Sequence, residues 1–339
     1  MSVSASVEFK INWDIDEDAQ QLADFEARIE AGQIIEPDDW MPHNYRVGML
    51  RMAEHHANSE IVGALPEGEW ITRAPSLRRK LALIAKVQDE VGHGQMLYRV
   101  SQDLGKKRDQ MLRDLITGKT KYHNVFNYPA PTWADVTMIQ WLVDGAAILN
   151  QATLAEGSYG PYVRTMKRIN MEEAFHFKSG EDMILTLMSG TARQKQMAQE
   201  AFDRWWEPCL MFFGPPDKDS VKTQPFMRWR IKTATNDELR QRFVDRFAPA
   251  ALDLGLKIHV TAKDEHGMVT GCREDPKLHH DEARGHWDVS QPDWNEFYRV
   301  IRGHGPLNKE RVGLRRFSYE QGQWVRRAVL GSTELPPAA

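Results

Sequence analysis

The sequence predicts an all-α protein built around a four-helix bundle, and three observations lead to this prediction. Between residues 36 and 214, stretches of good helix formers place apolar residues at helical spacing. Short segments containing proline or glycine separate these stretches, which is typical of helices packed in a bundle. One segment, 256–271, alternates apolar and polar residues as a strand does, so a short β-hairpin is also expected.

Composition bounds the class of protein. The 339 residues can bury a substantial core, and a formal net charge of -4 gives no basic excess for nucleic acid. No stretch approaches the roughly eighteen uninterrupted apolar residues of a membrane span. Two cysteines, Cys209 and Cys272, lie outside any C-x-x-C pattern, which fits a reducing compartment. Residues 1–20 carry acids where a signal peptide has an apolar centre, so we expect a cytoplasmic protein.

The N-terminal half contains the first two bundle helices. Residues 1–35 form a partly extended leading segment with one short helix over 20–32. The first bundle helix is expected from residue 36, with Asp38 and Asp39 at its start, to an end at Pro66 and Gly68. The second is expected over 77–104, with Pro75 in its first turn and Gly105 after it. A shorter helix precedes the loop 122–132.

The other two bundle helices and an extension complete the chain. Helices are expected over 133–158 and 162–190, and a fifth over 192–214 ends at a Gly-Pro-Pro break. Further helices are expected over 236–256, 292–303 and 308–330. We therefore expect a leading segment (1–35), a bundle (36–215) and a mostly helical C-terminal extension (216–339) packed on that bundle.

A repeated E-x-x-H pair lies within two of these helices. Glu90 precedes His93, and Glu173 precedes His176, by three residues each. Composition alone would give about two such pairs, so their number is uninformative. Their positions are informative, because each pair lies in the interior of a long helix, where this spacing projects both side chains to one side.

Each pair follows a helix that carries a single acid in an apolar stretch. Glu60 precedes Glu90 by 30 residues, and Asp144 precedes Glu173 by 29. If the four helices turn these faces inward, four carboxylates and two imidazoles meet, which is the ligand set of a di-iron or di-manganese site. The candidate catalytic residues and metal ligands are therefore Glu60, Glu90, His93, Asp144, Glu173 and His176.

This ligand set suits two iron ions. Carboxylate oxygens can bridge two metals, and four of them offset the charge of two divalent ions. Without metal, the carboxylates would repel one another in a buried site and take up protons. Lys86 lies four residues before Glu90 and should point toward it. It forms either an ordinary surface ion pair or a contact inside the metal-free site that supports the ligands.

Several segments resemble one enzyme family. "SEIVGALPEGEWITRAPSLRRK", "AKVQDEVGHG", "WLVDGAAILNQ" and "TNDELRQRFVD" closely resemble the catalytic A subunits of the ring-1,2-phenylacetyl-CoA epoxidases, which are bacterial multicomponent di-iron monooxygenases. The resemblance runs from about residue 25 to about residue 330, with an apparent insertion near 259–275 and a longer N-terminus. It implies a ferritin-like fold and assigns the metal to the same six residues.

The resemblance also implies a reaction and partners. A di-iron centre would use dioxygen to epoxidise the aromatic ring of phenylacetyl-CoA in aerobic phenylacetate degradation. Electrons would come from NADPH through a separate reductase that carries the FAD and the iron–sulfur cluster. Two further chains, a structural, paralogous C subunit and a small bridging B subunit, would complete a hetero-oligomer, with no nucleic acid or membrane involved.

Substrate contacts are less well defined by the sequence. A basic cluster beside a helix start could bind CoA phosphates, or could be a solvated surface or subunit contact; it comprises Arg73, Arg78, Arg79 and Lys80. Apolar residues near the ligands are candidate ring neighbours or plain core; they are Ile61, Ala64, Ala147 and Phe175. Among the other histidines, His55 and His56 are expected at ordinary surface or core positions, with the alternative that one of them supports a metal ligand from outside. A histidine cluster at 279, 280 and 286, in a segment expected to be weakly ordered, is assigned no metal.

Three alternatives stay open at this point. An epoxidase of another aryl-CoA, such as benzoyl-CoA, would need the same ligand set. A non-catalytic ferritin-like structural or iron-handling subunit would not need all six ligands. A ribonucleotide reductase small subunit would need a radical-bearing tyrosine near the metal, and neither Tyr98 nor Tyr159 lies at an obvious position for it.

Overall fold

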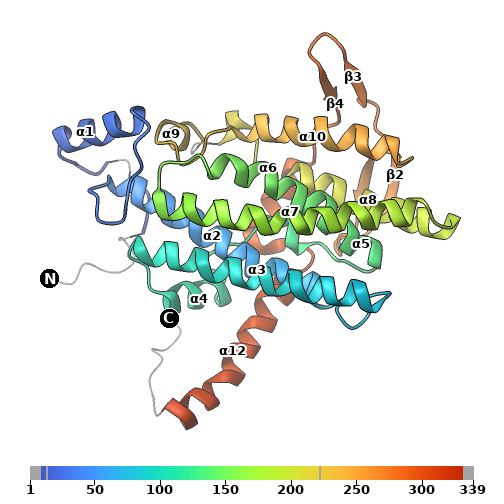
Figure 1. The fold of residues 1–339 in the computed structure, drawn as a ribbon, viewed down its shortest axis with the longest axis horizontal. Helices are drawn as coiled ribbons and strands as arrows, with labels where there is room; N and C mark the ends of the chain where they lie inside the picture. The colour runs from blue at the N-terminus through green and yellow to red at the C-terminus, as the bar shows by residue number, and fades with distance from the viewer. Residues whose placement is uncertain (1–8, 13, 221–222, 331–339) are drawn as a thin grey trace.

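Helices form most of the chain in the computed structural model, which confirms the prediction of an all-α bundle (Figure 1). The structure describes residues 9–12, 14–220 and 223–330. The bundle helices run along the long axis of the molecule and comprise α2 (His43–Gly68), α3 (Leu77–Asp103), α6 (Asp144–Leu154) and α7 (Gly160–Met188). Helix α2 packs against α3, α6 packs against α7, and α3 contacts α7, so the four helices enclose one interior.

Local signals explain most helix boundaries. Ser76 caps α3 by accepting a hydrogen bond from the backbone N–H of Arg79. The first bundle helix starts at His43 and not at residue 36. Asp39 accepts a hydrogen bond from the backbone N–H of Glu36, and this contact closes a separate turn ahead of the helix. The helix ends at Gly68, within the predicted end at Pro66 and Gly68, and Pro66 lies inside its last turn. Pro75 precedes the cap of α3 instead of lying in its first turn.

The third bundle helix is not uniform, which the sequence pattern did not predict. It consists of α5 (Trp133–Met138), a π-helical turn η2 (Ile139–Val143) and α6. Helix α7 crosses this turn closely: a Cβ added at Gly180 would lie 2.4 Å from the carbonyl carbon of Gln140. Asp144 begins α6 directly after the π turn, so this irregularity sets where its carboxylate points.

Shorter elements surround the bundle. Before the third bundle helix lie α1 (Ala19–Glu30), α4 (Arg108–Ile116) and η1 (Asn124–Asn127). After α7 come α8 (Ala192–Leu210), η3 (Asp217–Asp219), α9 (Thr223–Arg228), α10 (Asn236–Asp253), α11 (Trp294–Arg299), η4 (Val300–His304) and α12 (Asn308–Leu330). Helix α8 ends four residues earlier than expected. Helix α10 packs on α6 and α8, and α12 contacts α4 before it projects from the body of the molecule (Figure 1).

Two antiparallel hairpins follow α10. Strands β1 (His259–Lys263) and β2 (Val269–Glu274) form the expected hairpin and pack on α8. Strands β3 (His279–Asp281) and β4 (His286–Asp288) form a second hairpin against α10. The expectation of a weakly ordered segment over 279–286 is therefore wrong, because Asp245 of α10 holds His286 and the backbone of Trp287.

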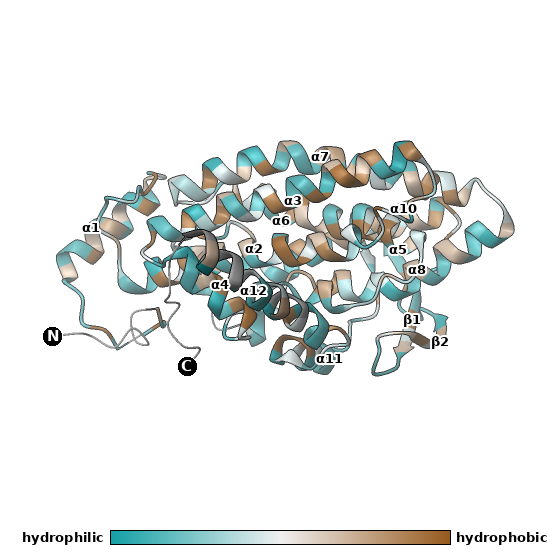
Figure 2. Cartoon of the chain, turned by 90° about the horizontal axis from the view of Figure 1, so that it is seen from below, coloured by the Kyte–Doolittle hydropathy of each residue, from teal (hydrophilic) through white to brown (hydrophobic). Residues whose placement is uncertain are grey.

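The core lies between the helices in two main apolar clusters. One joins the third bundle helix, α7, α8 and α10 around Trp205 and Phe247, and the other joins α1, α2, α3 and α7 around Tyr45. Hydrophilic and hydrophobic residues are interspersed along the helices (Figure 2). In the described part of the chain, none of the helices combines the length and hydropathy that a membrane crossing requires.

Candidate metal centre

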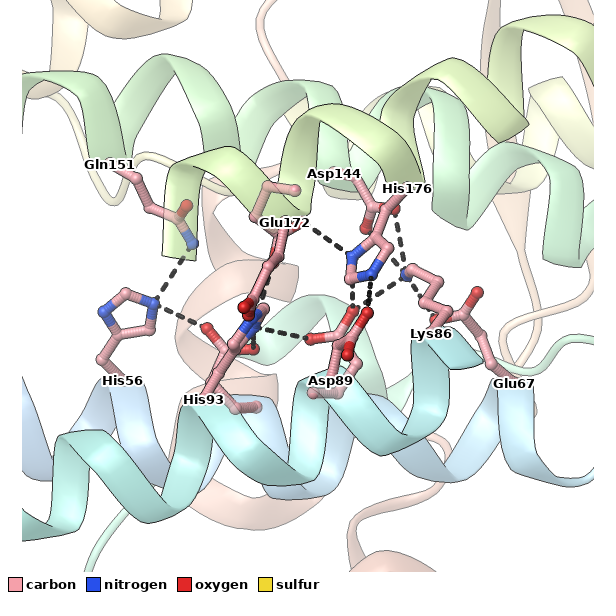
Figure 3. A network of polar contacts seen from close by, with 12 residues as sticks. His56, Glu67, Lys86, Asp89, His93, Asp144, Gln151, Glu172 and His176 are labelled. Carbon is pink, nitrogen blue, oxygen red and sulfur yellow. Dashed lines mark hydrogen bonds and ion pairs between the residues drawn. The ribbon is translucent and has the colours of Figure 1, made fainter. Parts of the chain in front are cut away.

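The six side chains singled out by the repeat meet inside the bundle. Glu60 comes from α2, Glu90 and His93 from α3, Asp144 from α6, and Glu173 and His176 from α7. All six are buried, and both histidines are fully enclosed. The structure therefore brings together every residue of the predicted ligand set, with one acid or one E-x-x-H pair per helix. Figure 3 labels His93, Asp144 and His176 of this set.

Two carboxylates lie between the two histidines. The Nδ1 atoms of His93 and His176 are 3.4 and 3.3 Å from the two oxygens of Glu173. The same nitrogens are 3.8 and 3.5 Å from the oxygens of Glu90. Two overlapping groups result, one with Glu60, Glu90, His93 and Glu173 and one with Asp144, Glu173 and His176. Within each group, the potential ligand atoms lie within 4.8 Å of one another.

The outer nitrogens of both histidines are held by carboxylates. The Nε2 atom of His93 is 2.7 Å from Glu172, and that of His176 is 3.2 Å from Asp89. The pairing crosses between helices, since α7 holds the histidine of α3 and α3 holds the histidine of α7. Such contacts fix the imidazole orientation and raise its basicity toward a metal.

Sequence reasoning missed these two carboxylates, although a signal was present. Each E-x-x-H pair is immediately preceded by a second acid, Asp89 before Glu90 and Glu172 before Glu173. Each of these acids lies about 100° around the helix from the glutamate that follows it, and there it contacts the histidine of the neighbouring helix.

A further contact comes from α2. The Nε2 atom of His56 is 2.8 Å from Glu60, and its Nδ1 atom is 2.8 Å from the hydroxyl of Tyr162. Gln151 lies 3.4 Å from the same Nε2 atom (Figure 3). The favoured expectation for His56, an ordinary surface or core position, is therefore wrong. The alternative, support of a ligand from outside, agrees with its contact to the carboxylate of Glu60.

Lys86 is buried inside this group of acids and does not form a surface ion pair. Its Nζ atom lies 2.5 Å from Glu67, 3.0 Å from Glu90 and 3.0 Å from Asp144. The other oxygen of Glu67 accepts a hydrogen bond of 2.9 Å from Gln140 in the π turn. Glu67 is thus a fifth buried acid beside the cluster, and it lies seven residues after Glu60 on the same face of α2.

Protonated histidine and lysine side chains offset the negative charge of the buried carboxylates. Burial alone would lower the pKa of His176, but the adjacent Glu173 and Glu90 raise it to about 9. Burial would likewise raise the pKa of Glu60, but His56 and His93 hold it well below its usual range. The pKa of Lys86 is raised despite its burial, because Asp144, Glu67 and Glu90 surround it.

These residues fit a pair of metal ions. The Nδ1 atom of His93 is buried without a hydrogen-bond partner in the described structure, although carboxylate oxygens lie around it. A nitrogen turned toward carboxylates while its ring partner is hydrogen-bonded outside is the arrangement of a metal ligand. Four carboxylates and two imidazoles would supply oxygen and nitrogen ligands for two ions, and Glu90 and Glu173 each lie near both histidines.

The cluster forms one side of a large cavity. The cavity has a volume of about 680 Å³, and Glu60, Lys86, Glu90, Asp144 and Glu173 line its buried part. Exposed basic residues line it where it meets solvent; they are Arg51, Lys119 and Lys121. Much of the remaining wall is aromatic or aliphatic, with Phe126, Ile139, Val143, Phe212 and Phe226 among its members.

The cavity does not include most of the predicted substrate contacts. Of the four candidate ring neighbours only Ala147 lines it, and Phe175 is 53% exposed on the outside of α7. None of the basic residues at 73 and 78–80 is among its lining residues, and the guanidinium of Arg73 stacks on Trp70 at 4.0 Å. The basic cluster at 73 and 78–80 was predicted from a run of positive charge, and such a run does not specify which surface of the molecule the side chains face.

Comparison with known proteins assigns the family. The family described as "Phenylacetic acid catabolic protein" matches residues 17–324. The chain belongs to this family. The chain is also 47% identical over 310 residues to the A subunit of 1,2-phenylacetyl-CoA epoxidase from Escherichia coli (strain K12), covering 91% of this chain and 96% of that relative.

Family membership confirms the resemblance drawn from the sequence. The match spans the whole bundle and most of the C-terminal extension, and therefore includes every residue of the metal centre described above. A ribonucleotide reductase small subunit is no longer an alternative for this chain.

Proposed function

We propose that this chain is the catalytic oxygenase subunit of a phenylacetyl-CoA epoxidase that forms the ring 1,2-epoxide. The observation that carries the proposal is the convergence of four carboxylates and two imidazoles at the buried end of a cavity large enough for an acyl-CoA arm. The name and 47% identity of the relative support the choice of substrate.

Two iron ions would be held by Glu60, Glu90, His93, Asp144, Glu173 and His176. When bound, they supply the reduction of dioxygen that organic side chains cannot perform. One oxygen atom joins the two carbons of a ring double bond, and the other leaves as water with two electrons and two protons. NADPH supplies the electrons through a reductase whose FAD and iron–sulfur cluster lie on another chain.

The residues of this chain position, shield and balance the site. The aromatic and aliphatic wall around Ala147 would hold the ring and exclude water. Asp89, Glu172 and His56 orient the ligands from outside. Lys86 would hold the carboxylates together while no metal is bound, and a metal-loaded crystal structure with an unchanged Lys86–Asp144 contact would contradict that role.

The basic end of the cavity is the better candidate for CoA phosphates. Arg51, Lys119 and Lys121 lie where the cavity opens, and Lys232 lies half-buried in its wall. Arginine and lysine donors suit phosphate oxygens. The cluster of Arg73, Arg78, Arg79 and Lys80, first predicted for this role, lies outside the cavity lining and serves better as a subunit contact.

We further propose that the chain works in a cytoplasmic hetero-oligomer. Its E. coli relative is named as one subunit of an enzyme, so a complex is expected here too. The proposed partners are a paralogous C subunit, a small B subunit and the reductase. The FAD and the iron–sulfur cluster are proposed for the reductase, since the two cysteines of this chain cannot supply the four thiolates of a common iron–sulfur cluster.

The test is coupled turnover. The chain is loaded with ferrous iron, combined with its partner subunits and reductase, and oxygen uptake is followed with phenylacetyl-CoA. Glu90→Ala and Glu173→Ala should abolish coupled product formation while circular dichroism keeps its helical signal. Uptake without epoxide in the unmodified complex would count against the proposal.

A panel of thioesters separates the alternatives. Faster turnover of benzoyl-CoA than of phenylacetyl-CoA would assign the other substrate. Tight iron binding with no oxygen uptake for any thioester would favour a structural or iron-handling subunit.

A further inference from the structure

Helix α8 and the β1–β2 hairpin meet along a row of matched polar contacts. Gln199, Asp203 and Glu207 follow one another at four-residue spacing on one face of α8. Each of them contacts β1 or the chain just before it. The side chain of Gln199 forms hydrogen bonds with the backbone of Lys257, and the Nζ atom of Lys263 lies 2.6 Å from a carboxylate oxygen of Glu207. At the centre, the Nδ1 atom of His259 lies 2.8 Å from Asp203.

Cys272 adds a thiol to this central contact. It pairs with Thr261 in the hairpin register, and side chains that are paired across an antiparallel ladder share one face. His259 is two residues from Thr261, so it lies on that face as well. Potential ligand atoms of Asp203, His259 and Cys272 all lie within 4.8 Å of one another.

A buried polar atom without a partner lies in the same place. The Oγ1 atom of Thr261 is inaccessible to solvent and has no hydrogen-bond partner in the described structure. Buried hydroxyls are normally satisfied by protein groups or ordered water. Thr261 lies between His259 and Cys272 on the face toward α8, so a water molecule bound to a cation there would satisfy it.

We propose that Asp203, His259 and Cys272 form a second metal site, which binds one zinc-like divalent cation with a water as fourth ligand. A carboxylate, an imidazole and a thiolate are the donors that such ions prefer. Tetrahedral coordination needs ligand atoms about 3.3–3.7 Å apart, so small side-chain rotations close the site. Binding releases the thiol proton to solvent, and the two anionic ligands neutralise the ion.

This site is chemically distinct from the centre in the bundle. The bundle centre offers oxygen and nitrogen ligands only, whereas the proposed site includes sulfur. It would clamp the hairpin to α8, and so give a role to the segment that the sequence shows as an apparent insertion near 259–275. The inference does not depend on the proposed epoxidase activity.

Cobalt titration of the full-length chain, stripped of metal, tests the proposal. A cobalt–thiolate bond gives an intense near-ultraviolet absorption that oxygen and nitrogen ligands do not give. We expect this absorption to saturate at one cobalt per chain and to disappear when zinc is added. Cys272→Ser should abolish it, and Cys209→Ala, which alters the other thiol, should leave it unchanged.

Variants of the other two ligands complete the test. His259→Ala and Asp203→Asn should each weaken cobalt binding at this site by about 10–100-fold. Circular dichroism checks that each variant is folded, and Cys272→Ser is the safest because its side chain is exposed. No thiolate absorption in the unmodified chain, its survival in Cys272→Ser, or unchanged affinity in His259→Ala would overturn the proposal.

Discussion

At the scale of single residues, the candidate metal centre depends on side chains that do not bind metal themselves. Each histidine presents Nδ1 to the cluster because a carboxylate of the other helix holds its Nε2. Glu172 and Asp89 therefore determine the tautomer and the ring orientation of the two histidines. This arrangement ties α3 to α7 at the level of the ligands.

Weakening one of these contacts should loosen the metal without unfolding the chain. Glu172→Gln replaces a charged acceptor by a neutral one, and we expect affinity for ferrous iron to fall by about 10–100-fold. Anaerobic equilibrium dialysis measures the affinity, and circular dichroism checks the helices. Glu181→Gln, on the exposed side of the same helix, is the matched control and should leave affinity unchanged. Equal affinities in both variants would contradict an orienting role for Glu172.

Lys232 should make substrate capture depend on pH. Burial lowers the pKa of Lys232 to about 8. Its side chain is charged below that pH and neutral above it, so its attraction for CoA phosphates is lost as pH rises through about 8. We expect kcat/KM for phenylacetyl-CoA, which reports groups of the free enzyme, to fall over that range. Lys232→Arg stays charged and should remove the fall, whereas the same fall in that variant would exclude Lys232 as its cause.

At the scale of elements, the π turn between α5 and α6 places Asp144 and Gln140. Gln140 bonds Glu67, which in turn contacts Lys86, and Asp144 follows the turn directly. Glycine at position 180 of α7 allows the two backbones to approach at this turn. The crossing thus connects helix packing to ligand geometry.

A methyl group at this crossing should therefore destabilise the fold. Gly180→Ala would push a Cβ against the backbone of Gln140 and Trp141, which cannot move aside as a side chain can. We expect the free energy of unfolding to fall by about 1–3 kcal/mol, measured by urea denaturation.

A second glycine provides the control. Gly92→Ala adds a methyl that meets no atom within 4 Å apart from its chain neighbours and the nearby backbone of its own helix. It should instead raise stability by about 0.5–1 kcal/mol through helix propensity. A neutral Gly180→Ala would show that the two helices can separate there without loss.

At the scale of the whole molecule, two contacting helices expose apolar side chains at helical spacing. On α3 these are Leu77, Leu81, Ile84 and Val91, and on α7 they are Met171, Phe175 and Leu185. Exposed apolar stripes on adjacent helices are typical of protein interfaces. A partner subunit on this face would also cover Asp89 and Glu172, whose side chains are 37% and 31% exposed.

Replacing apolar residues on this face should weaken the complex. Leu81→Ser with Phe175→Ser removes two exposed side chains, and we expect affinity for the partner subunits to fall at least about tenfold with the helical signal unchanged. Size-exclusion chromatography of the mixed subunits measures the loss. Phe317→Ser on α12, a similarly exposed residue elsewhere, is the control. Loss of assembly in the control alone would place the interface on α12.

The sequence alone determined the bundle and its six candidate ligands. Helical periodicity and capping residues are local properties, and the E-x-x-H spacing fixes two side chains on one helix face whatever surrounds the helix. The repeat of this pattern in two helix pairs then implied four faces turned inward. The hairpin at β1–β2 was predictable for the same reason, because alternation is read within one strand.

The tertiary structure alone decided which groups surround those ligands. The contacts from Glu172, Asp89 and Lys86 to the other helices depend on how helices far apart in sequence are rotated against one another. The π turn lies where α7 crosses closely at Gly180, and the basic residues of the cavity come from segments between residues 51 and 232. Spacing along one helix determines the direction in which a side chain points from that helix. A site forms only where side chains from several helices point to the same place, and the packing of the whole chain determines whether they do.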